Sequence, residues 1–109
     1  MTQQHFLSVA ASSTAMLFFW SNLAQAQEFP NYDREAYCER VTQANSGDPS
    51  VTTLCLEAEQ AGYQAVSAAW AGLPPNVRLT CIGMGVEAGG SYYALSNCVT
   101  LYIMATLPK

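Results

Sequence analysis

Apolar positions recur at intervals of three and four residues along most of the chain, a spacing that predicts helices. The longest such stripe starts at Val51 and reaches Trp70, so one helix of about six turns is expected there. Asp48 is suited to cap its start through the side-chain carboxylate, and Pro49 is suited to the first helical position. The sequence Gly-Leu-Pro-Pro at 72–75 ends it, because a glycine followed by prolines does not continue a helix.

A shorter helix is predicted before this one. Tyr37, Val41 and Ala44 keep helical spacing, and the Pro-Asn pair at 30–31 marks a turn and a helix cap ahead of them. Ser46 and the glycine after it break the pattern, so the two helices are expected to be joined by a short loop.

Two further helices are predicted after the prolines. Val77 and Cys81 lie about one turn apart, although two glycines inside this segment each cost a helix about 1 kcal/mol relative to alanine. Ser91 follows a second pair of glycines and is suited to cap the last helix. Leu95 and Tyr102, seven residues apart, keep helical spacing beyond this cap.

The four cysteines are spaced in a way that matches this helix pattern. Cys38 and Cys55 enclose sixteen residues, as do Cys81 and Cys98, and each interval has a glycine-containing break at its centre. Residues equally distant from the turn of a helical hairpin face each other, so each pair would join its own hairpin and add roughly 3 kcal/mol by loop closure. Pairing between the hairpins is the alternative. The predicted fold is all-α, with two disulfide-clasped helical hairpins and about four helices.

An apolar stretch precedes these helices. Residues 6–20 carry no charge, and Ala24-Gln25-Ala26 has the small side chains of a signal-peptide cleavage site. Segment 1–26 is therefore expected to be a signal peptide, although it contains no Lys or Arg. The alternative is an uncleaved membrane anchor, because residues 6–24 approach the length of about 20 that a span needs; membrane contact is expected only in that case. The rest, 27–109, is expected to form one four-cysteine helical domain.

The cysteine count and the charge distribution limit the compartment and the partners. An even number of cysteines in a short exported chain is typical of disulfides, so the protein is expected to be periplasmic or secreted. The net charge is -4, and no basic surface is present that would bind phosphates, so nucleic acid is not expected as a partner. The acidic residues concentrate in the first part of the domain, at Glu28, Asp33, Glu35, Glu39, Asp48, Glu57 and Glu59.

The sequence contains little that supports catalysis. His5, the only histidine, lies in the leader, which removes nucleophile–histidine pairs and histidine metal ligands from the exported domain. Oxidised cysteines supply neither a thiolate nucleophile nor zinc ligands. Glu35 and Glu39 lie one helical turn apart. Two carboxylates flanked by arginines, however, are typical of a solvated helix face. We therefore expect no enzyme activity, no metal site and no cofactor.

A carboxylate and two aromatic rings share one side of the longest predicted helix. Glu59, Tyr63 and Trp70 are spaced by four and seven residues. Such a group can form a ligand site, but the interpretation we favour is core packing, with Glu59 hydrogen-bonded locally. The glycines between 83 and 90 lack the spacing of a phosphate-binding loop, and we expect them to allow close helix approach and a hairpin turn.

The last predicted helix has an unusual composition. No charged residue occurs from 88 to 108, whereas the surface helix of a small protein normally carries charges on its outer face. Such a helix is either surrounded by other elements or contacts a partner, and tyrosine-rich, charge-poor surface is typical of protein interfaces. We predict an interface, formed with another exported protein or by self-association. The candidate interface residues are Tyr92, Tyr93, Leu95, Val99 and Tyr102.

The spacing of cysteine, proline and aromatic residues resembles a family of small exported bacterial proteins with four cysteines and no assigned activity. This resemblance implies a secreted or periplasmic helical domain and no chemistry. It extends over 30–98. The residues that carry it are Pro30 to Asp33, Tyr37, Cys38, Cys55, Glu59, Gln60, Tyr63, Trp70, Leu73, Pro74, Arg78, Cys81, Gly89 to Tyr92, Leu95 and Cys98.

A more distant resemblance is to periplasmic lysozyme-inhibitor domains of the LprI type. Those domains are also helical and cysteine-stapled, and they carry a cysteine, a glutamate and a tyrosine in the order of Cys55, Glu59 and Tyr63. The charge-poor second half of this chain departs from them. We predict a non-enzymatic exported binding or structural module. The alternatives are a lysozyme-inhibitor-like protein and a membrane-tethered accessory subunit of a complex.

Overall fold

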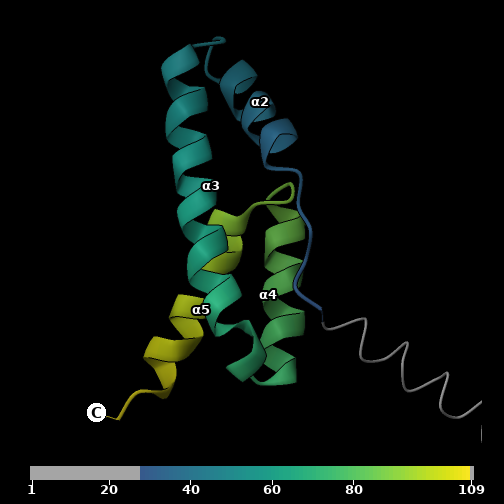
Figure 1. Cartoon of the computed structure of the whole chain (residues 1–109), viewed down its shortest axis with the longest axis vertical. Coiled ribbons are helices and arrows are strands. Elements are labelled where there is room, and N and C mark those ends of the chain that lie inside the picture. Colours follow the sequence, from purple (N-terminus) through teal and green to yellow (C-terminus); the bar gives the residue numbers. More distant parts are fainter. Residues whose placement is uncertain (1–27, 109) are drawn as a thin grey trace, which may run out of the picture.

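The computed structural model describes residues 28–108, which form four α-helices and one 3-10 turn and contain no strand (Figure 1). The all-α prediction is confirmed for this part of the chain. Segment 1–26, expected to be a signal peptide or an anchor, lies outside the described residues. The elements are α2 (Arg34–Ala44), α3 (Pro49–Ala69), η1 (Trp70–Gly72), α4 (Pro75–Glu87) and α5 (Tyr92–Thr106).

The helices form two antiparallel hairpins, α2 with α3 and α4 with α5, and α3 extends from the first hairpin onto the second. The first half of α3 lies beside α2, and its second half packs against α5, which in turn packs on α4 (Figure 1). α3 is 21 residues long, so it reaches from the end of the first hairpin to the far end of the second. The structure thus has one end built from α2 and the start of α3, and another built from α4, α5 and the end of α3.

Three of the four helices start at a side-chain cap. The Asp48 carboxylate accepts a hydrogen bond from Ser50 N (2.9 Å) with Pro49 at the first helical position, and the Ser91 hydroxyl accepts one from Ala94 N (3.1 Å). Both predicted caps are confirmed. The cap of α2 is Asp33, and not the predicted Pro-Asn pair, because its carboxylate is the group that reaches the first-turn amides.

Both disulfides lie within their own hairpins, as predicted. Cys38 pairs with Cys55 at a Cα–Cα distance of 5.6 Å, and Cys81 pairs with Cys98 at 5.4 Å. These separations are ordinary for disulfides. Pairing between the hairpins, the alternative that the spacing left open, is therefore wrong.

The turns of the two hairpins use left-handed backbone conformations. In the first turn Ser46 has a φ of 63° and Gly47 one of 70°; in the second, Gly89 and Gly90 have φ values of 99° and 88°. Glycine adopts such angles without steric cost, and this explains the glycine at the centre of each cysteine interval. The predicted role of the glycine pair at 89–90 in a hairpin turn is confirmed.

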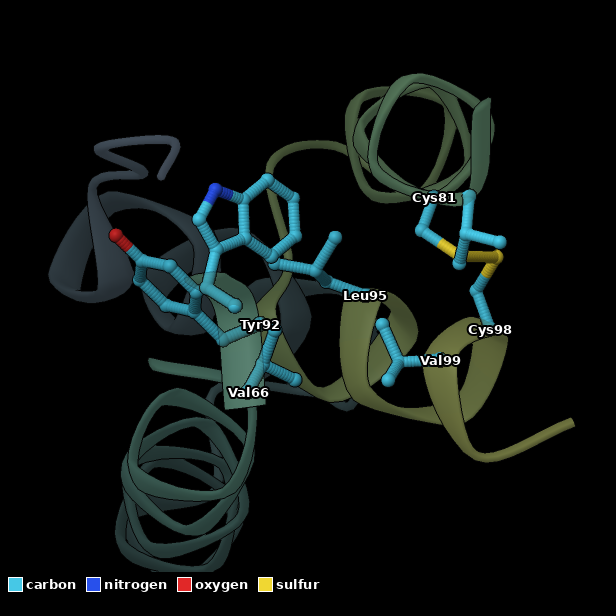
Figure 2. Close-up of a cluster of buried hydrophobic side chains, with 8 residues drawn as sticks. Val66, Cys81, Tyr92, Leu95, Cys98 and Val99 are labelled. Atoms are coloured by element: carbon cyan, nitrogen blue, oxygen red, sulfur yellow. A yellow bond between two sulfur atoms is a disulfide. The ribbon is translucent and has the colours of Figure 1, made fainter. Parts of the chain in front are cut away.

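The hydrophobic core lies where α3, η1, α4 and α5 meet. Val66 and Trp70 come from the end of α3 and from η1, Val77 from α4, and Leu95 and Val99 from α5. The Cys81–Cys98 disulfide closes one side of this cluster, and Leu95 and Val99 point into it (Figure 2). A core that includes a covalent bond is expected in a domain of this size, since small domains bury little apolar surface.

Close contact between α3 and α5 depends on Gly62. A Cβ atom at this position would lie 2.6 Å from the Tyr92 carbonyl oxygen and 2.9 Å from Tyr93 N, both of which are backbone atoms. At Gly83, by contrast, a Cβ atom would have no neighbouring atom within 4 Å, so this glycine lies in open space on α4. The expectation that the glycines between 83 and 90 mediate close helix approach is therefore wrong for Gly83.

Gly62→Ala is expected to lower the free energy of unfolding by about 2 kcal/mol, because α5 must move away from α3 to make room for the methyl group. Gly83→Ala is the matched control, a glycine-to-alanine change inside an exposed helix, and it should raise stability by about 1 kcal/mol. Urea unfolding of both variants measures the difference. Equal effects of the two substitutions would contradict the close approach at Gly62.

Candidate functional site at the last helix

Three of the five candidate interface residues belong to the core. The exposed fractions of Tyr92, Leu95 and Val99 are 2%, 0% and 4%, so none of them offers surface to a partner. Helical spacing correctly groups these residues on one side of α5, but that side faces α3 and α4. Their assignment to an accessible interface is therefore wrong.

The other two candidates lie at the edge of the core or outside it. Tyr102 is half-buried and packs against the core cluster, where it lines a small cavity of about 80 Å³ with Leu73 and Val77. Tyr93 is 54% exposed and lines one end of a groove along α2 and α3. Of the five, Tyr93 is thus the one that offers a large part of its side chain to solvent.

The exposed side of α5 contains Tyr93 together with four residues that the sequence did not mark as interface candidates. Leu101 and Met104 are 67% and 64% exposed, and Asn97 and Thr100 are exposed between them and Tyr93. Every one of these side chains is uncharged. We call this set the outer face of α5: Tyr93, Asn97, Thr100, Leu101 and Met104.

Charged side chains are segregated to one end of the molecule. Beyond Glu59, the described residues carry charge only at Arg78 and Glu87, both on α4. α5 and the second half of α3 have none. The end of the molecule built from α4 and α5 is therefore nearly free of charge, whereas the other end carries a net negative charge. On α2 itself Arg34 and Arg40 balance Glu35 and Glu39, and the negative excess comes from the helix caps Asp33 and Asp48 and from Glu57 on α3.

A buried carboxylate holds the start of α5 in place. Glu59 on α3 is 1% exposed, and it accepts hydrogen bonds from Ser91 Oγ (2.7 Å), Tyr92 N (2.7 Å) and Tyr93 N (3.0 Å). A negative charge at this place satisfies first-turn amides that have no partner inside the helix and interacts favourably with the helix dipole. The bonds join residues more than 30 positions apart, so the predicted local bonding of Glu59 is wrong.

The aromatic residues around Tyr92 form a second set of contacts with the start of the domain. The Tyr92 hydroxyl donates to Pro30 O (2.8 Å) and accepts from Tyr32 N (2.9 Å), and the Tyr92 ring is stacked on Phe29 at 5.6 Å. Tyr63 meets Tyr92 edge to face at 5.1 Å. The extended segment before α2 is therefore fixed on the second hairpin, a role that sequence periodicity does not signal because the segment is not helical.

Tyr32 anchors the same segment to α4. Its hydroxyl donates to Ile82 O (3.0 Å), and its ring occupies the space where a Cβ of Gly85 would lie. Burial, followed by the nearby Tyr92 hydroxyl, raises the pKa of Tyr32 above its ordinary value. Gly85 thus allows close approach as predicted, but to a tyrosine and not to a neighbouring helix.

A groove of about 290 Å³ is lined by residues of α2 and α3 and by Tyr93 at the start of α5. It is lined mainly by apolar groups of Tyr37, Val41, Val51, Leu54 and Tyr93. The one carboxylate on its wall, Glu59, already accepts three hydrogen bonds from α5 and its cap. The groove therefore lacks the convergent polar groups that position a substrate.

The carboxylates of α2 are arranged as expected for a solvated face. Glu35 and Glu39 are exposed, and within residues 28–108 no group of three or more His, Cys, Asp or Glu residues is placed to hold a metal ion. Hydrogen bonds from the backbone and side chain of Ser50 lower the pKa of Asp48, which acts as a helix cap. No helix among the described residues combines the length and the apolar character needed to cross a membrane.

Comparison with known proteins adds no further assignment. No family model, curated protein or solved structure matches the chain.

Proposed function

We propose that the protein is an exported, non-enzymatic binding module, periplasmic or secreted, whose working surface is the outer face of α5. The observation that carries this proposal is the combination of exposure and composition on that face. Leu101 and Met104 are about two thirds exposed, at 67% and 64%, and no charged side chain surrounds them on α5. Apolar surface of this kind is typical of protein interaction sites.

A protein surface suits this face better than a lipid surface. Helices that lie on membranes usually carry Lys and Arg on the polar side, which attract anionic lipid headgroups. α5 has no basic residue, and the chain as a whole has a net charge of -4. An anionic membrane would repel the acidic end of the molecule without any compensating attraction at α5.

The two disulfides support a rigid binding module in an oxidising compartment. Both bonds lie within hairpins, and the Cys81–Cys98 bond ties α5 to α4 directly behind the exposed face. A surface held rigid before binding loses little conformational entropy when a partner docks.

Site-specific photo-cross-linking in the producing cell tests this proposal. A photoreactive amino acid in place of Leu101 is expected to give one defined protein adduct, since this side chain lies on the outer face of α5. The matched control is the same amino acid in place of Gln43, an exposed residue on α2. Mass spectrometry of the adduct identifies the partner.

The adduct at Leu101 should also decrease strongly when Met104→Lys is introduced beside it, because a charge then lies within the contact surface. No adduct at Leu101, or equal labelling at Leu101 and Gln43, would contradict the proposal. Circular dichroism and disulfide mapping of each variant establish that the compared proteins are folded and oxidised.

A further inference from the structure

Four residues on the outer face of α5 have the spacing of a helix-pairing seam. Tyr93, Asn97, Thr100 and Met104 are separated by four, three and four residues, and all four are exposed. Residues at alternating intervals of three and four form the contact line of two-stranded helical packing, in which each side chain inserts between side chains of the facing helix. Leu101 flanks this line and extends its apolar surface.

The seam is complementary to itself when two copies run antiparallel. With a two-fold axis between positions 98 and 99, Tyr93 of one copy lies opposite Met104 of the second copy, and Asn97 lies opposite Thr100. The aromatic ring then meets a thioether, a favourable contact, and the amide meets a hydroxyl with which it forms a hydrogen bond. The symmetry repeats each contact, because an isologous interface uses the same surface on both subunits.

Charge also favours the antiparallel arrangement. The end formed by α2 and the start of α3 has a net negative charge because the caps Asp33 and Asp48 add to a helix whose own charges cancel. This end lies beyond the N-terminus of α5, where Arg40 Nη2 donates to Gly89 O (2.6 Å). Antiparallel α5 helices place the two acidic ends on opposite sides of the dimer and align the helix dipoles favourably. Parallel helices would bring the two acidic ends together and cause repulsion.

We infer that the partner of the outer face of α5 is a second copy of this chain, docked antiparallel through Tyr93, Asn97, Thr100 and Met104. This inference rests on the proposed function, since it identifies the partner of the same surface. It also explains why the seam contains two polar residues, because a polar residue within a seam defines the register and orientation of helix pairing.

Sedimentation equilibrium of the oxidised protein tests self-association. We expect a monomer–dimer equilibrium, and Met104→Lys should raise its dissociation constant by at least about tenfold, the effect of losing an anchor residue in a protein interface. The matched control is Leu79→Lys, which places the same charge at an apolar residue of α4 that is 51% exposed but lies outside the seam. This control should leave the dissociation constant within about twofold of the value for the unsubstituted protein.

Cysteine cross-linking tests the orientation. When Tyr93→Cys and Met104→Cys proteins are mixed under mild oxidation, the antiparallel dimer predicts rapid formation of the mixed disulfide. Tyr93→Cys alone should cross-link slowly, because two copies of position 93 are then separated by about 16 Å along the helix axis. Peptide mapping shows whether the two native disulfides are kept.

The outcomes separate this inference from the proposed function. A protein that stays monomeric up to about 1 mM overturns the dimer, and an adduct of another protein at Leu101 would then leave the proposed function standing. If the protein stays monomeric and the photoreactive group at position 101 also gives no adduct, both the dimer and the proposed function are overturned. Two other results would also overturn the inferred dimer. One is self-association that is weakened by Leu79→Lys but not by Met104→Lys, and the other is efficient cross-linking of Tyr93→Cys to itself.

Discussion

Replacement of Glu59 by alanine is expected to lower the free energy of unfolding by about 4 kcal/mol. The substitution leaves two backbone N–H groups and the Ser91 hydroxyl without their acceptor at a position that is 1% exposed. Each unsatisfied buried donor costs about 1–3 kcal/mol, part of which water entering the vacated space recovers. Since small domains have a total stability of about 5–15 kcal/mol, this loss would be a large fraction of the total.

Urea unfolding followed by far-ultraviolet circular dichroism measures this loss. Glu57→Ala is the matched control, because Glu57 is an exposed glutamate on the same helix, and its removal should change stability by no more than about 0.5 kcal/mol. Glu59→Gln keeps the side-chain volume but retains only one acceptor oxygen. Its loss of unfolding free energy should therefore lie between those of Glu57→Ala and Glu59→Ala. A Glu59→Gln protein as stable as the parent would show that α5 does not need the carboxylate.

Removal of the Cys81–Cys98 disulfide by a double substitution to alanine is the second large effect, expected to cost about 4 kcal/mol. Closing a loop with a sequence separation of 17 accounts for roughly 3 kcal/mol, since the bond restricts the unfolded chain. The remainder comes from the cavity left in the core, because both sulfur atoms belong to residues of the buried cluster.

The equivalent change in the first hairpin is the matched comparison. The Cys38–Cys55 bond closes a loop of the same sequence separation, 17, but Cys55 is only half-buried and the bond lies outside the core cluster. Its removal should therefore cost about 3 kcal/mol and mainly increase hydrogen exchange in α2. A larger loss from Cys38–Cys55 than from Cys81–Cys98 would contradict the placement of the core in the second hairpin.

Sequence reasoning predicted those features that depend on neighbours along the chain. The caps at Asp48 and Ser91, the hairpin turns at the glycines and the pairing of cysteines within each hairpin all follow from local geometry. A capping side chain bonds to amides two or three residues away, and a hairpin fixes which positions face each other. The cap at Asp33 was missed because proline and asparagine just before it carry a competing turn signal.

The orientation of α5 could not be predicted in this way. Periodicity correctly groups Tyr92, Leu95 and Val99 on one side, but α5 lacks charge on every side, so composition alone does not show which side faces water. The seam residues on the opposite side then look like ordinary polar and apolar positions. The choice of side depends on where α3 and α4 lie.

The sequence by itself thus determined the class of the fold, the helices and the two disulfides of this protein, because these depend on spacing and on short-range hydrogen bonds. Only the tertiary structure decided that Glu59 caps a helix more than 30 residues away and that the outer face of α5, rather than Tyr92, Leu95 and Val99, meets solvent. The physical reason is that burial and long-range hydrogen bonds depend on how the two hairpins pack. One close contact at Gly62 brings α3 and α5 together, and that contact places both the buried carboxylate and the exposed seam.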